Sequence, residues 1–121
     1  MWKIKQNTLL DLLEASKNLY PREYASLLGG NAKEQLVFEY IIPPVLSGKS
    51  FAAIDLVAMP IDKSIIGSIH SHPAGRGNAS RADVKLFRRY LINLILYHPF
   101  GKTDFVAYGS NGEPMEVAIV E

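Results

Sequence analysis

Short apolar runs that stop at glycine or proline constrain the fold of this 121-residue chain more than any other feature. Strand-forming residues fill three early runs, at 24–28, 35–42 and 51–59. Because glycine and proline interrupt strands, each run is expected to be one strand followed by a turn or loop. Gly29-Gly30 is expected to form the first of these turns. The early chain therefore predicts a sheet rather than a helical bundle.

Two segments carry the pattern of a helix instead. Residues 8–19 place leucines on one face and charged residues on the other, which predicts an amphipathic helix. It should end near Tyr20-Pro21, because the residue before a proline disfavours helical geometry. A second helix is expected to begin at Ser80.

The rest of the chain returns to strand patterns. The run 65–70 is apolar, and the polar face of the second helix is lost from about Asn93, so 93–97 is expected to be a strand. Residues 105–108 and 115–120 flank a Gly-Ser-Asn-Gly sequence and predict a terminal hairpin. These elements predict one α/β domain over residues 1–121, with a mixed sheet and helices packed on it.

Composition excludes several classes of function. The chain has no cysteine, which removes thiol nucleophiles, thiolate zinc sites and disulfides. Its formal charge of +1 predicts neither a nucleic acid nor a membrane as partner, and Lys85, Arg88 and Arg89 are interpreted as the solvated face of a helix. No signal sequence or long apolar run is apparent, so a cytoplasmic location is expected.

The segment His70-Ser71-His72-Pro73 carries the pattern with the clearest chemistry. Side chains two residues apart on a strand point to the same side, so His70 and His72 can bind one ion. The loop after Pro73 lets the chain reverse, and Asp83 then arrives one turn into the next helix. Two imidazoles and a carboxylate favour zinc and leave a fourth position for water. Hydrolysis of an amide would also need a carboxylate elsewhere to accept a proton from that water.

Each half of this motif also has a purely structural explanation. A His-x-His on a strand is often a surface or packing feature, and the spacing from Ser80 to Asp83 equally fits a helix capping box. The coincidence of both halves, with a turn-rich loop between them, favours a metal site. His98 precedes a proline in an expected turn and is assigned no role.

In residue types and in every spacing, the segment from His70 to Asp83 resembles the metal signature of the JAMM (MPN-plus) metalloproteases. Upstream, residues 20–30 look like the stretch that carries the catalytic glutamate of this family, and Glu23 takes that position. The resemblance implies a cytidine-deaminase-like mixed sheet sandwiched by helices. It also implies a role for each of five residues: zinc ligands His70, His72 and Asp83, an acid/base Glu23, and Ser80 as stabiliser of the tetrahedral oxyanion.

The same resemblance implies a zinc isopeptidase or peptidase that releases a ubiquitin-like or sulfur-carrier protein from its conjugates. Two alternatives stay open, because fold and metal do not fix a substrate. One is a metallo-amidase acting on another small or peptide substrate, and the other is a non-catalytic scaffold. The presence of all five groups counts against the scaffold. A chain of 121 residues also leaves little room for the insertions with which eukaryotic relatives grip ubiquitin.

Overall fold

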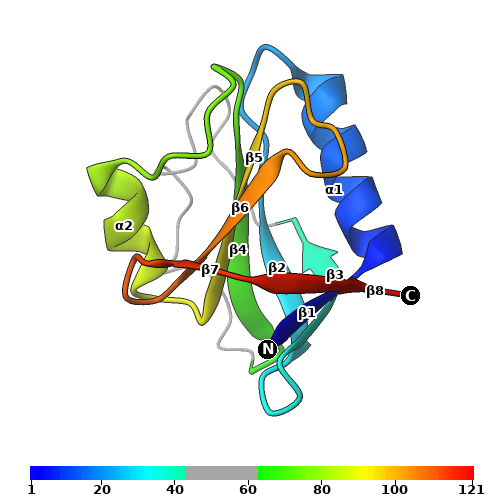
Figure 1. Cartoon of the computed structure of the whole chain (residues 1–121), viewed down its shortest axis with the longest axis vertical. Helices are drawn as coiled ribbons and strands as arrows, with labels where there is room; N and C mark the ends of the chain where they lie inside the picture. Colours follow the sequence, from blue (N-terminus) through cyan, green and yellow to red (C-terminus); the bar gives the residue numbers. More distant parts are fainter. Residues whose placement is uncertain (43–62) are drawn as a thin grey trace.

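Within residues 1–42 and 63–121, the part of the chain that the computed structural model describes, eight strands form one mixed sheet and two helices cover it (Figure 1). The helices are α1 (Gln6–Leu19) and α2 (Arg81–Phe87). The strands are β1 (Trp2–Lys5), β2 (Ala25–Asn31), β3 (Leu36–Ile41), β4 (Ile65–His72), β5 (Ile92–Tyr97), β6 (Phe105–Gly109), β7 (Pro114–Met115) and β8 (Val117–Val120). The strand expected at 51–59 lies outside the described residues.

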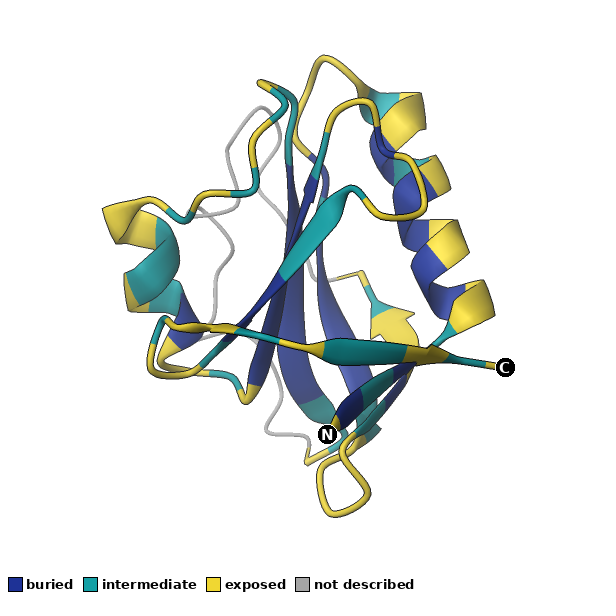
Figure 2. Ribbon diagram, viewed as in Figure 1, coloured by how far each residue is buried: buried dark blue, intermediate teal, exposed yellow. Residues whose placement is uncertain are grey.

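Helix α1 forms where the sequence predicts it, starting two residues earlier. Leu9, Leu12 and Leu13 share the buried stripe of the helix, which Figure 2 shows in dark blue against an exposed outer side. Ser16 is polar yet fully buried there, because its hydroxyl donates to Leu12 O at 2.9 Å. The helix ends at Leu19, with Tyr20 as its C-cap before Pro21, as expected. Neither helix of the described residues is long and apolar enough to cross a membrane.

Strand β4 lies inside the sheet, whose order is β7-β6-β5-β4-β2-β3-β1-β8. It runs antiparallel to β2 and parallel to β5, with Gly67 opposite Ile92 and His72 opposite Tyr97. The segment that carries α2 connects the two parallel strands. Because β4 and β5 are parallel, their carboxyl ends meet at one edge of the sheet, which is where α/β folds build ligand sites. Both histidines of the motif belong to this end of β4.

The two helices pack on opposite faces of the sheet, which confirms the expected sandwich. Leu94 and Leu96 of β5 join the larger core, under α1, whereas Ile95 between them packs with Phe87 of α2. This alternation follows from the period of two along a strand. The larger core also draws on β1, β2, β3, β4 and β6, and the smaller one on β6.

The expected turn at Gly29-Gly30 is wrong, because β2 continues through both glycines to Asn31. The glycines lie at irregularities in pairing with β3 and β4, where backbones approach closely. A Cβ added to Gly30 would lie 2.0 Å from Leu36 O. Glycine is needed here for close approach rather than for a change of direction.

The C-terminal hairpin is confirmed, but its second arm is shorter than expected. Only β7 pairs with β6, and after Glu116 the chain continues as β8. Strand β8 pairs in parallel with β1, a strand that the sequence does not predict. Figure 1 shows β7 and β8 as one segment that crosses in front of the other strands. This segment therefore occupies both ends of the sheet order.

Candidate active site

The end of β4 is fixed by the residue between the two histidines. Ser71 is fully buried, and its hydroxyl accepts a hydrogen bond from Tyr24 N at 2.7 Å, while Ser71 N donates to Tyr24 O at 2.9 Å. His70 and His72 therefore face the other way, as the strand alternation predicts. His70 is only 2% exposed, and its ring centroid lies 6.3 Å from that of Phe87 on α2.

The start of α2 delivers the carboxylate. Ser80 is the N-cap: its Oγ accepts from Asp83 N at 3.1 Å, and Ser80 N donates to Asp83 Oδ2 at 2.8 Å. This reciprocal pair is a capping box. The capping explanation of the Ser80 to Asp83 spacing is thus correct, and it holds Asp83 with its carboxylate turned toward β4.

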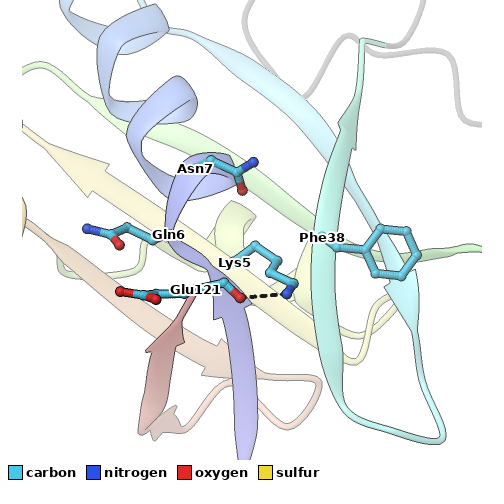
Figure 3. A pocket seen from close by; sticks show the side chains of 5 residues that line it. All are labelled: Lys5, Gln6, Asn7, Phe38 and Glu121. Carbon is cyan, nitrogen blue, oxygen red and sulfur yellow. Dashed lines mark hydrogen bonds between the residues drawn. The ribbon is translucent and has the colours of Figure 1, made fainter.

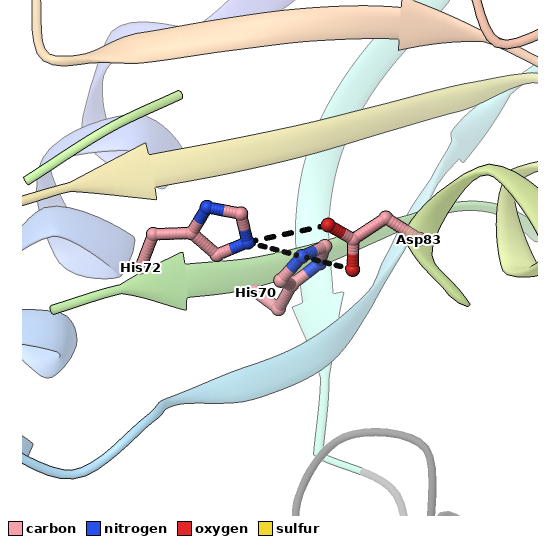
Figure 4. A group of neighbouring side chains, drawn as sticks. All are labelled: His70, His72 and Asp83. Atoms are coloured by element: carbon pink, nitrogen blue, oxygen red, sulfur yellow. Dashed lines mark hydrogen bonds and ion pairs between the residues drawn. The ribbon is translucent and has the colours of Figure 1, made fainter. Parts of the chain in front are cut away.

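Three side chains converge between β4 and α2. His70 Nε2 lies 3.0 Å from Asp83 Oδ1, and His72 Nε2 lies 3.3 Å from Asp83 Oδ2. The two Nε2 atoms are 3.1 Å apart, and one ligand atom from each residue falls within 4.8 Å of the others. Figure 4 shows the two rings and the carboxylate turned toward one another. The structure thus brings together the three predicted metal ligands.

The orientation of His72 suits a metal ligand. Its Nδ1 lies 2.9 Å from Arg76 O, and a carbonyl oxygen can only accept, so Nδ1 carries the hydrogen. In the neutral ring, Nε2 then has the lone pair that a metal requires. With His70 and Asp83, this gives two imidazole nitrogens and one carboxylate oxygen, a donor set that fits a divalent metal with a position left open.

Charge interactions within this group shift two pKa values. Burial raises the pKa of Asp83, but hydrogen bonds from His70, His72 and Ser80 N outweigh it and hold that pKa well below its usual range. Asp83 is therefore an anion at neutral pH. The hydrogen bond to Asp83 raises the pKa of His72 against the opposing effect of burial. In the absence of a metal, a proton on His72 partly neutralises the negative charge of Asp83.

Glu23 is exposed and lies outside the three-residue group. Its backbone is nevertheless held next to β4, because it directly precedes Tyr24, which is bonded twice to Ser71. Its negative charge contributes to the raised pKa of His72. The structure thus brings Glu23 to the border of the histidine pair, and its catalytic role stays a prediction.

Ser80 is exposed and lines a hollow of about 330 Å³ along α2. The other lining residues include three cations and two apolar side chains: Ala79, Arg81, Val84, Lys85 and Arg88. Another hollow, of about 420 Å³, lies where β1 passes into α1 (Figure 3). Its lining, Lys5, Gln6, Asn7, Phe38 and Glu121, contains none of the predicted site residues. Of these two hollows among the described residues, the one at Ser80 borders the motif.

Two supporting contacts escape sequence reasoning. The carbonyl of Arg76 holds the His72 ring, and the phenyl ring of Phe87 backs His70. A backbone carbonyl is common to every residue type, so no sequence pattern marks it. Phe87 is visible only as part of the apolar face of a helix.

Comparison with known proteins places this geometry in a family. A family model described as prokaryotic homologs of the JAB domain matches residues 5–114. A Haloferax volcanii protein named "Probable metalloprotease" is 30% identical over 118 residues, covering 90% of this chain and 73% of that protein. A JAB1/MPN domain protein from Archaeoglobus fulgidus has a TM-score of 0.78 at 29% identity, over 98% of this chain and 99% of that one.

Two further solved structures resemble this chain. One is described as "JAMM: A Metalloprotease-like Zinc Site in the Proteasome and Signalosome". It has a TM-score of 0.76 at 28% identity, over 100% of this chain and 99% of that one. A protein from Desulfitobacterium hafniense, at 17% identity and a TM-score of 0.66 over 100% of this chain and 94% of that one, shares the fold. These likenesses and the His-His-Asp group support a metalloprotease-type hydrolase. The chain belongs to the prokaryotic homologs of the JAB domain.

Proposed function

We propose that this chain is a zinc-dependent isopeptidase or peptidase that releases a ubiquitin-like or sulfur-carrier protein from a lysine or peptide bond. The observation that carries the proposal is the convergence of His70, His72 and Asp83 within 4.8 Å at the carboxyl end of β4. Membership of the JAB-domain family and the likeness to a "Probable metalloprotease" support hydrolysis as the reaction.

His70, His72 and Asp83 would hold the zinc ion. When bound, zinc would act as a Lewis acid, which polarises a carbonyl group and lowers the pKa of water so that it loses a proton more readily near neutral pH. The carboxylate of Asp83 also balances the charge of the ion, and its ionised state at neutral pH requires no further change on binding. The hydrogen bond from His72 Nδ1 to Arg76 O keeps the ring oriented for this role.

Glu23 would move the proton. As an exposed carboxylate at the border of the histidine pair, it would accept a proton from the attacking water and return it to the departing amine. Two hydrogen bonds between Tyr24 and Ser71, one accepted by the Ser71 hydroxyl and one donated by Ser71 N, hold the residue that follows Glu23 against β4. A flexible side chain on a fixed backbone suits a group that must both take and give a proton.

Ser80 would stabilise the developing oxyanion. Its Oγ uses a lone pair to accept from Asp83 N, which leaves the hydroxyl proton to donate. Ser80 also lines the hollow along α2. A hydrogen bond to the developing charge is worth more in the transition state than in the ground state, so it accelerates the reaction.

The substrate part of the proposal rests on the family resemblance. The extended tail of a small modifier protein would suit a site at a sheet edge, because a tail can lie beside a strand. A metallo-amidase acting on a small or peptide substrate would use the same five groups. The identity of the cleaved substrate distinguishes the two activities.

The test is to measure bound zinc and then cleavage of a panel of ubiquitin-like and sulfur-carrier fusions, with and without a chelator. We expect about one zinc per chain and cleavage that the chelator abolishes. Cleavage that resists the chelator would contradict zinc hydrolysis. Cleavage of short peptides but of no fusion would favour the amidase.

The Glu23→Gln variant tests the proposed base. We expect unchanged zinc affinity and turnover reduced about 10²- to 10⁴-fold, because the amide cannot accept the proton. Glu34→Gln is the matched control, since Glu34 is an exposed glutamate in the turn between β2 and β3. Full activity of the Glu23 variant would remove Glu23 from the mechanism.

A further inference from the structure

The loop between β4 and α2 carries more of the site than its glycine-rich sequence suggests. It supplies Arg76 O to the His72 ring, and it leads directly into Ser80 and Asp83. Gly75 within it has a φ of +84°, a left-handed conformation that glycine adopts without strain. Because glycines restrain a backbone so little, contacts from elsewhere must hold this loop in place.

Tyr108 on β6 provides such a contact. Its hydroxyl donates to Gly77 O at 2.7 Å, and Gly77 is the residue after Arg76. The Tyr108 ring is 7% exposed and stacks on Phe87, with centroids 5.2 Å apart and planes inclined by 24°. Phe87 is also the ring that backs His70. Tyr108 therefore touches both the loop and the helix that carry the site.

The loop backbone lies directly on the sheet at this point. A Cβ added to Gly77 would lie 2.5 Å from Val106 and 3.1 Å from the Tyr97 ring. The chain can approach β5 and β6 this closely only because residue 77 is glycine. This close packing brings Gly77 O within reach of a hydroxyl that is anchored in the core.

Tyr108 is a hydrogen-bond donor throughout the neutral pH range. Burial raises the pKa of its hydroxyl, and the negative charge of Asp83 adds to this, against a hydrogen bond from Ala79 N–H that lowers it.

We propose that Tyr108 is a positioning residue of the metal site: its hydroxyl fixes the loop so that Arg76 O meets His72 Nδ1. The inference rests on the proposed metal function, because its consequence is tighter zinc binding. Without the bond to Gly77 O, the loop can move off the sheet and the His72 ring loses its acceptor. Groups that orient a metal-bound histidine typically contribute about 10- to 100-fold to affinity.

The Tyr108→Phe variant removes only the hydroxyl and keeps the ring stacked on Phe87. We expect zinc affinity, measured by competition with a chromophoric chelator, to fall by about 10- to 100-fold. Tyr97→Phe is the matched control, because the Tyr97 ring contacts the same glycine but its hydroxyl makes no hydrogen bond to the described residues. Equal zinc affinity in the two variants would overturn the inference.

A measurement without zinc separates a positioning role from a general loss of structure. In the ¹⁵N spectrum of the metal-free protein at a pH where His72 is neutral, we expect Tyr108→Phe to change the tautomer balance of His72 and Tyr97→Phe to leave it unaltered. An unaltered tautomer balance of His72 in Tyr108→Phe would overturn the inference.

The failure of this inference differs from failure of the proposed function. If the wild-type protein binds zinc and Tyr108→Phe binds it equally well, only the role of Tyr108 is lost. If the wild-type protein binds no zinc, the proposed metal function and the inference that rests on it both fail.

Discussion

At the scale of single residues, Ser71 links the metal site to the proposed base. Its buried hydroxyl accepts from Tyr24 N, one residue after Glu23. The Ser71→Ala variant leaves this buried N–H without its acceptor, which costs about 1–3 kcal/mol of unfolding free energy. We also expect slower turnover at unchanged zinc affinity, because Glu23 loses its fixed backbone. Chemical denaturation, turnover and zinc competition measure these effects.

Ser16→Ala is the matched control for this variant. Ser16 is equally buried, but its hydroxyl donates to Leu12 O, which lies within helix α1. Removing a donor from a carbonyl that has a helical partner should cost less than about 1 kcal/mol. Equal losses of stability in the two variants would contradict the special position of Ser71.

The protonation of His72 predicts how zinc affinity depends on pH. Asp83 raises the pKa of His72 above its ordinary value of 6.5, so the metal-free site keeps its proton to a higher pH. Zinc must displace that proton, and its affinity should therefore fall as the pH drops through the raised pKa. Competition titrations between about pH 5.5 and 8 measure the effect.

His98→Asn is the control for this titration. His98 is exposed, and its ring stacks on that of Tyr20 with the ring centroids 4.3 Å apart. Its side chain takes no part in the His-His-Asp group. Loss of the His98 imidazole should leave the pH dependence of zinc affinity unaltered. A zinc affinity that is constant over the whole range would contradict His72 as a ligand.

The ligand residues were predictable because their relative directions are set locally. His70 and His72 follow the period of two along a strand, and Asp83 follows from the first turn of a helix. Arg76 and Tyr108 were not predictable. The first acts through its backbone, and the second reaches the loop from 31 residues away along the chain.

At the scale of elements, β2 shows why a pair of glycines need not be a turn. Gly29 and Gly30 look alike in sequence but have different neighbours. A Cβ added to Gly30 would contact the backbone oxygen of Leu36, whereas one added to Gly29 would contact the exposed side chain of Glu39. Local pattern cannot tell a turn from a close approach between strands, because the second depends on a partner strand.

This difference gives a prediction for the two positions. In Gly30→Ala the new Cβ would lie 2.0 Å from a backbone oxygen, so β2 and β3 must separate, and we expect a loss of about 2–3 kcal/mol in unfolding free energy. In Gly29→Ala the Glu39 side chain can move aside, and we expect a loss below about 1 kcal/mol. Thermal and denaturant unfolding of the two variants measure these losses. A greater loss at Gly29 would contradict the described packing.

At the scale of the whole molecule, the packing of helices on a mixed sheet was predictable and the edges of the sheet were not. The pattern of residues 8–19 and the apolar runs that follow specify helices on a mixed sheet. Strands β1 and β8 are only four residues each, and their pairing joins Trp2 to Val117. Strand β1 carries no pattern long enough to predict. Residues 117–120 are predicted as a strand, but their pairing with β1 is not, because the two strands lie at opposite ends of this sequence.

The pairing of β1 with β8 has a consequence for synthesis on the ribosome. Strand β1 emerges from the ribosome well before 117–120, the strand that pairs with its outer side. Until those residues arrive, one side of β1 presents open backbone hydrogen-bonding groups. We expect the nascent chain to complete its sheet late, and in that interval β1 is the edge that a chaperone would need to shield from other chains.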